Sequence, residues 1–199
     1  MHTFDAIKKR RAVNYFDSSH RPLRSDIKKL MRHVLLSPTS FNMQNWRFVI
    51  VTDANLRKKI KEAAWNQAQI TEASFLVIFC ADLNAWKKAD RCWRKAPLGV
   101  RKNMVAVIKR IYGRNKQLQY DEAIRSCGIA AQTLMLAAKA MNYDTCPMVG
   151  FDAEKIAKFI KLPKDHLVTM IIAVGKKIKE PWPRSGQLAL KEVVKENTF

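Results

Sequence analysis

No apolar run in this sequence is long enough to cross a membrane as a helix. The longest, from Phe75 to Ala81, has the length of a β-strand, whereas a spanning helix needs about 20 apolar residues. Residues 1–17 carry charges where a signal peptide needs its apolar stretch. The composition is that of a globular protein, with 48% hydrophobic residues among 199. We therefore expect a cytoplasmic protein with no membrane partner.

The sequence also lacks the short motifs of common catalytic and nucleotide-binding sites. It contains no G-x-G-x-x-G, no P-loop and no H-E-x-x-H, and no serine lies in a G-x-S-x-G. The four histidines are scattered, and we interpret each as an ordinary surface or partly buried residue. We therefore predict no catalytic side chain. If the protein is an enzyme, a cofactor should supply the chemistry.

Metal-binding patterns are missing as well. The four cysteines, Cys80, Cys92, Cys127 and Cys146, form no C-x-x-C pair and have no histidine close by, so the sequence predicts no zinc site and no other metal. Cys80 ends an apolar segment and Cys127 lies in a helical apolar pattern. Both are predicted to be buried thiols in a reducing compartment.

Acidic residues are scarce, with 17 Asp and Glu against 37 Lys and Arg and a formal net charge of +20. Such a charge attracts nucleotide cofactors, nucleic acid or acidic membranes. It is densest in residues 86–125, where aromatic residues interleave with the basic ones: Trp86, Trp93, Tyr112 and Tyr120. This segment is either a nucleic-acid groove or a solvated helical excursion. We favour the solvated excursion, because no recognised nucleic-acid-binding motif accompanies the charge.

Hydrophobic periodicity predicts helices and strands that alternate along the chain. Helices are expected at 3–10, 24–36, 54–64, 121–141 and 153–160, with a long basic helical region at about 86–117. Strands are expected at 46–53, 73–82 and 166–176, and a loop or short strand at 143–151. Segment 73–82 is almost wholly apolar, which favours burial on both faces of a sheet. Helices separate the strands, so the pattern predicts an α/β or α+β fold with a central sheet.

Four segments become distinctive when they are taken together. They are KKRRAVNYFD (8–17), SPTSFNMQNWRFVIV (37–51), CPMVGFD (146–152) and AVGK…WPRSGQLALKEVV (173–194). In order and separation they resemble the motifs of the FMN-dependent, oxygen-insensitive NAD(P)H nitroreductase family. The corresponding family patterns are R-R-S-x-R-x-F, S-P-S-x-x-N-x-Q-P-W-x-F, P-x-x-G-F-D and a basic phosphate-binding turn with a closing E-V-V. The resemblance covers essentially the whole chain.

The resemblance implies an α+β sandwich in which helices wrap a central, mostly antiparallel sheet. Residues 1–199 would form a single domain, with a variable basic helical excursion at about 86–120 that roofs the pocket and shapes acceptor choice. The implied assembly is an obligate, intertwined homodimer with FMN at the interface and the C-terminal tail over the partner subunit.

The implied reaction is ping-pong. NADH or NADPH delivers hydride to FMN, and a nitroaromatic, quinone or related small-molecule acceptor then takes the electrons. A dehalogenase or an oxidase of the same fold is the alternative among enzymes. A basic nucleic-acid-associated module is the alternative from a different class.

By resemblance, Arg10 and Arg184 should bind the FMN phosphate, with Arg11, Ala12 and Asn14 nearby. Guanidinium groups suit a phosphate dianion because they donate charge-assisted, bidentate hydrogen bonds. Taken alone, the pair Arg10-Arg11 would be interpreted as the basic end of a helix.

Three further groups of residues are assigned by the same resemblance. Pro38, Ser40 and Asn42 should reach the FMN that is bound mainly by the other subunit. The flavin ring edge should face Pro147, Met148, Val149 and Gly150, with glycine allowing close approach of the main chain. Asn66 and Gln67 are candidates for contacts to the polar edge of the flavin.

The chain departs from the family pattern at three positions. Ala12 stands where Ser is frequent, and Asn45 stands where Pro is usual. Asn142 replaces a common Gly at a helix end, where Asn tolerates the left-handed backbone. None of these changes removes the arginines assigned to the phosphate.

Overall fold

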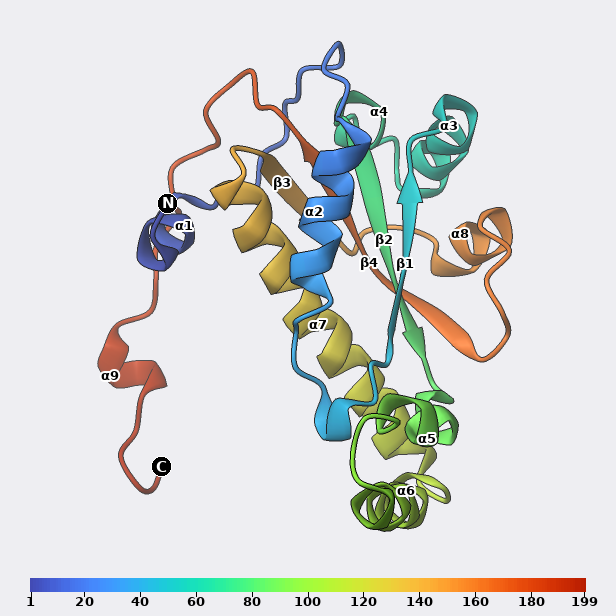
Figure 1. Ribbon diagram of the computed structural model, residues 1–199. Coiled ribbons are helices and arrows are strands. Elements are labelled where there is room, and N and C mark those ends of the chain that lie inside the picture. The colour runs from blue at the N-terminus through green and yellow to red at the C-terminus, as the bar shows by residue number, and fades with distance from the viewer.

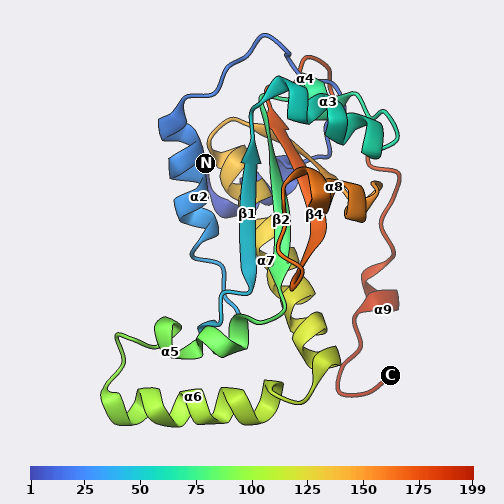
Figure 2. The same cartoon turned by 90° about the vertical axis from the view of Figure 1, so that its right-hand side faces the viewer.

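A computed structural model describes all 199 residues as one sheet with helices on both faces (Figures 1 and 2). The strands are β1 (Trp46–Val51), β2 (Phe75–Asp82), β3 (Asp144–Met148) and β4 (His166–Gly175). The longer helices are α2 (Arg24–Val34), α3 (Ala54–Ala63), α6 (Leu98–Tyr112) and α7 (Lys116–Ala140). The shorter ones are α1 (Thr3–Lys9), η1 (Ser40–Asn42), α4 (Gln69–Glu72), η2 (Ala85–Lys88), α5 (Ala89–Cys92), α8 (Ala153–Phe159) and α9 (Leu190–Val193).

The sheet has the order β1-β2-β4-β3, and every neighbouring pair is antiparallel. This confirms the predicted α+β fold with an antiparallel central sheet. Residues 143–151, expected as a loop or short strand, contain the edge strand β3.

Strand β2 is buried on both faces, as its apolar sequence predicts. Phe75, Val77 and Phe79 join a hydrophobic cluster with α2 and α7 on one face of the sheet. Leu76 and Ile78 alternate with them and join a second cluster with α3, α4 and α8 on the other face. The period of two along a strand therefore divides the core into two layers.

The cysteines predicted to be buried are buried. Cys80 lies in β2 and Cys127 in α7, and neither side chain is in a disulfide. Burial raises the pKa of the Cys80 thiol to about 12 and that of Cys127 to about 11, because removal from water disfavours the charged thiolate.

Helix α7 runs across the centre of one sheet face (Figure 1) and starts earlier than predicted, at Lys116 rather than at residue 121. The side chain of Asn115 explains this start, since its Oδ1 accepts a hydrogen bond from the Leu118 backbone N–H at 2.9 Å. Asparagine is a favoured residue at a helix N-cap because it satisfies one otherwise free backbone donor.

The basic region at 86–117 is helical but broken into η2, α5 and α6, with Pro97 at the start of α6. Proline is tolerated there because the first residues of a helix need no backbone donor. The aromatic side chains of this region are largely used in packing: Trp86, Trp93 and Tyr112 surround a small cluster with Met43 and Ile108.

The last part of the chain leaves the body of the protein. Residues 188–199 are all exposed, and Figures 1 and 2 show α9 and the C-terminus separate from the other elements. None of the helices combines the length and the apolar character needed to span a membrane.

Candidate functional site

The segment that follows α1 runs beside β3 and meets the chain that follows β4. The Val13 backbone N–H donates to the Thr145 carbonyl at 3.0 Å, and Ala12 forms a parallel bridge with Thr145. Four residues after Val13, the Asp17 N–H donates to the Lys176 carbonyl at 2.8 Å. These bonds bring the first and last of the four distinctive segments together.

A cleft of about 360 Å³ lies where these two segments meet. Arg184 Nη2 donates to the carbonyl oxygen of Arg10 at 3.1 Å and to that of Lys8 at 3.3 Å. Arg11 donates to the carbonyl of Trp182. The remaining lining residues are Ala12, Asn14, Pro183, Ser185, Gly186 and Gln187, so no acidic side chain lines the cleft.

Arg10 lies close to the positive charges of Arg184 and Arg11, and no carboxylate in the cleft offsets their repulsion. Burial and the nearby charges of Arg184 and Arg11 lower the pKa of Arg10. A concave site that carries several cations and no carboxylate attracts an anion. The structure therefore brings Arg10, Arg11, Ala12, Asn14 and Arg184 together in an arrangement suited to a phosphate.

A line of polar contacts leads from this cleft to the loop after β3. The Cys146 thiol donates to Asn14 Oδ1 at 3.6 Å, and Gln69 Nε2 lies 3.9 Å from Cys146 Sγ. Gln69 Nε2 also donates to Gln67 Oε1 at 3.1 Å, and Gln67 Nε2 donates to the Gly150 carbonyl at 2.8 Å. Gln67 and Gly150 are thus connected to the arginine cleft. Cys146 and Gln69 had not been assigned to the site from the sequence.

Trp65 is the largest side chain at this loop, and the sequence analysis missed it. A Cβ atom at Gly150 would lie 2.4 Å from Trp65 Cζ3, so the indole approaches a position that only glycine leaves open. Trp65 and Asn66 both have left-handed backbone, with φ of 52° and 58°. The Trp65 side chain is 73% exposed and Val149 is 70% exposed. They place an open apolar surface beside Gly150.

Pro38, Ser40 and Asn42 lie elsewhere. They precede β1, at the end of the sheet that carries α5 and α6 (Figure 1). Ser40 Oγ accepts from the Tyr112 hydroxyl at 2.9 Å, and the Ser40 N–H donates to Glu122 Oε1 at 3.2 Å. Within one chain these three residues do not meet the arginine cleft.

Comparison with known proteins identifies the family of this chain. The model of the Nitroreductase family matches residues 7–176. DrgA of Synechocystis is 50% identical over 181 residues, which cover 90% of this chain and 86% of the relative. The chain belongs to the nitroreductase family.

One further relative and one solved structure are also similar to this nitroreductase family member. An NADH dehydrogenase of Thermus thermophilus is 27% identical over 192 residues, covering 95% of this chain and 93% of the relative. A protein of Exiguobacterium sibiricum, solved in complex with FMN, has the same fold with a TM-score of 0.93 at 24% identity. That comparison covers 98% of this chain and 97% of the solved one.

Two of the departures from the family pattern are accommodated locally. Asn142 has φ of 59° just after α7, the left-handed backbone that the frequent glycine would adopt. Asn45 is buried, its Oδ1 accepts from the Ser126 hydroxyl at 3.5 Å, and its carbonyl accepts from the Asp82 N–H at 2.7 Å. Hydrogen bonds of its side chain and backbone therefore hold Asn45 in the position where proline is usual.

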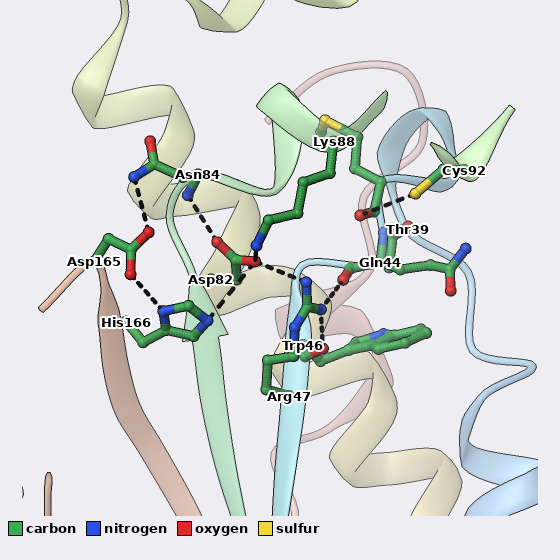
Figure 3. A network of polar contacts seen from close by, with 11 residues as sticks. Thr39, Gln44, Trp46, Arg47, Asp82, Asn84, Lys88, Cys92, Asp165 and His166 are labelled. Atoms are coloured by element: carbon green, nitrogen blue, oxygen red, sulfur yellow. Dashed lines mark hydrogen bonds and ion pairs between the residues drawn. The ribbon is translucent and has the colours of Figure 1, made fainter. Parts of the chain in front are cut away.

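A second polar network joins the ends of β1, β2 and β4 (Figure 3). The buried carboxylate of Asp82 accepts from Arg47 Nη2 at 2.7 Å and from Lys88 Nζ at 2.8 Å. His166 Nδ1 contacts Asp165 at 2.8 Å. Hydrogen bonds from Asn84 and then His166 lower the pKa of Asp165 to about 2. Because two cations already neutralise Asp82, we interpret this network as a clamp that holds the basic excursion on the sheet.

Proposed function

We propose that this protein binds FMN and uses it to pass electrons from NADH or NADPH to a nitroaromatic, quinone or related acceptor. The observation that carries the proposal is the meeting of Arg10, Arg11 and Arg184 in one cleft without an acidic neighbour. Membership of the nitroreductase family supports it. So do the FMN complex of the Exiguobacterium protein and the name of the Thermus relative.

The residues present fit a flavin mononucleotide. The arginines of the cleft would hold the phosphate by charge-assisted hydrogen bonds. Gln67 and Asn66 would orient the polar edge of the ring, and residues Pro147–Gly150 would offer backbone groups to its other edge. The exposed indole of Trp65 adds an apolar flank. When bound, the flavin supplies the hydride chemistry, so no side chain is assigned as acid or base.

The second part of the proposal is a homodimer that completes the site. Pro38, Ser40 and Asn42 would then reach the flavin held by the other subunit. Exposed apolar side chains on several elements support this assembly, because a second subunit that covers them would remove their apolar surface from water. They are Phe4 and Ile7 on α1, Leu36 after α2, Ile129 on α7, and Leu188, Leu190 and Val193 in the C-terminal tail.

The experiment that tests the flavin assignment is purification without denaturant. The protein should be yellow, should release FMN and not FAD on denaturation, and should oxidise NADH or NADPH when a nitroaromatic or quinone is added. Ping-pong kinetics should give parallel double-reciprocal lines. A colourless protein that fails to bind added FMN would contradict the proposal, and co-purified nucleic acid would favour the basic-module alternative.

A further inference from the structure

A second basic cleft, of about 460 Å³, lies at the opposite end of the sheet from α5 and α6, between α2, α3 and α4 (Figure 1). Four basic side chains and no acidic one line it: Arg21, Arg24, Arg57 and Lys58. None of its lining residues belongs to the Arg10–Arg184 cleft. The two are separate sites.

Arg57 is the unusual member of this lining. Its side chain belongs to a residue only 9% exposed, yet no carboxylate lies within ion-pair distance of it. Nε donates to the Ile70 carbonyl at 2.8 Å and Nη2 donates to that of Ala73, while Nη1 has no partner in the protein. Burial and the charge of Arg21 lower the pKa of Arg57. Buried charges are normally paired, because an unpaired one is costly.

Other donors around Arg57 are free. The side chains of Arg24 and Lys58 are exposed and make no hydrogen bond or ion pair within the chain. The hydroxyl groups of Ser18 and Thr52 also line the cleft and have no partner. Cations and hydroxyls that converge on one cleft are the donor set of a phosphate site.

Two acidic residues near the cleft are engaged in hydrogen bonds within the chain. Asp53 Oδ1 accepts from the Leu56 N–H at 2.7 Å and caps α3. Asp26 Oδ2 accepts from the Tyr143 hydroxyl at 2.9 Å. Helices α3 and α4 also carry Glu62 and Glu72. None of these four carboxylates forms an ion pair with a basic residue of the cleft, so the positive charge of the cleft is left for a ligand.

We propose that this cleft binds a compact anion of the pyrophosphate class. Arg57 would be the buried anchor, and Arg21, Arg24 and Lys58 would surround the outer phosphate. The volume of the cleft is larger than one phosphate group needs, so it can also hold the second phosphate of a pyrophosphate. The proposal does not depend on the flavin assignment, because no residue is shared.

Calorimetric titration with inorganic pyrophosphate tests the proposal, using the intact protein in the presence of saturating FMN. We expect saturable binding of one pyrophosphate per chain. Arg24→Gln combined with Lys58→Gln should weaken the affinity by roughly tenfold or more, because both positions are exposed and should tolerate the change. Arg57→Gln should weaken it further, with thermal unfolding followed to confirm that this variant folds.

Two controls locate the binding. Lys158→Gln combined with Lys164→Gln removes the same charge from exposed positions outside the cleft and should leave the affinity unchanged. Arg184→Gln changes the other basic cleft and should also leave it unchanged. If the Arg24/Lys58 and Lys158/Lys164 double variants lose affinity for pyrophosphate equally, the anion is attracted only by the net charge of the protein. A loss confined to Arg184→Gln would place the anion in the other cleft, and absence of saturable binding would show that Arg57 serves only to tie α3 to α4. Each of these results would overturn the proposal.

Discussion

Arg184 donates a hydrogen bond to the carbonyl oxygen of Arg10 at 3.1 Å, across 174 positions of the sequence. The contact holds both guanidinium groups at one cleft. Arg184 also lines the cleft, and only its Nη2 is bound to backbone carbonyls, so its Nη1 and Nε are free to meet a ligand.

We predict that Arg184→Ala weakens FMN binding by roughly ten- to a hundredfold, the loss expected when a charge-assisted contact worth ~1.5–3 kcal/mol disappears. The FMN affinity of Arg184→Lys should lie between those of wild type and Arg184→Ala, because lysine keeps the positive charge but lacks the planar guanidinium group. Fluorescence titration of the apoprotein with FMN measures the change. Arg110→Ala removes an exposed arginine from α6 and serves as the control. An Arg184→Ala variant with wild-type affinity would remove Arg184 from the phosphate site.

The proposed dimer gives a second prediction. Sedimentation at micromolar concentration should show a dimer, with an interface above the ~2,000 Å² scale of ordinary complexes. Leu36→Asp places a charge on the exposed apolar face beside α7 and should give monomers that lose FMN. Leu23→Asp changes another exposed leucine, just before α2, and should leave the dimer intact. A wild-type monomer that holds FMN tightly would refute the shared site.

Most helices and strands could be predicted from the sequence, because their patterns lie within one element. The two-residue period of β2 and the spacing of Leu30 and Val34 in α2 follow from side-chain geometry within one element. The start of α7 was misplaced because the cap at Asn115 was overlooked, although asparagine is a recognised cap. Trp65 could not be found in this way, because its contact with Gly150 joins two loops and depends on a left-handed backbone.

The placement of Pro38, Ser40 and Asn42 shows a different limit. The motif resemblance assigned them to the flavin, and the single chain keeps them away from the arginine cleft. Only a second subunit brings both groups of residues to one ligand. Their role stays a prediction that the dimer experiment tests.

Tyr143 gives a prediction for alkaline pH. Its hydroxyl donates to Asp26 at 2.9 Å, which ties the end of α7 to α2. Burial and then this contact with Asp26 raise the pKa of Tyr143 to about 12 from its ordinary value of 10.0. The unfolded chain therefore loses the tyrosine proton first, so stability falls as the pH rises from about 10 to about 12.

Tyr143→Phe isolates this contribution. Near neutral pH the variant should be less stable by about 1 kcal/mol, the net value of one hydrogen bond. The difference from wild type should shrink as the pH rises above 10, because only the wild type carries the titrating group. Urea unfolding at a series of pH values measures both proteins. A difference that stays constant with pH would show that folding does not raise the pKa of Tyr143.

The last prediction concerns the basic excursion of η2, α5 and α6. Its aromatic residues Trp86, Trp93 and Tyr112 are largely taken up in packing, so stacking of an acceptor on them is not the role that we propose. The cations are different, since Lys102 and Arg110 on α6 are exposed. We predict that they draw negatively charged acceptors toward the site and so influence acceptor choice.

Salt separates this role from that of a merely solvated surface. For a carboxylated nitroaromatic, kcat/KM should fall as ionic strength rises at fixed reductant, because mobile ions screen the attraction between exposed charges. For a neutral nitroaromatic of the same ring system it should change little. Lys102→Gln combined with Arg110→Gln should flatten the salt dependence for the charged acceptor. The pair Lys158→Gln and Lys164→Gln, which removes equal charge from α8 and the turn after it, should keep that dependence. If both acceptors respond alike in the wild type, the excursion is only a solvated surface, since a field that acts on substrate charge must distinguish a charged acceptor from a neutral one.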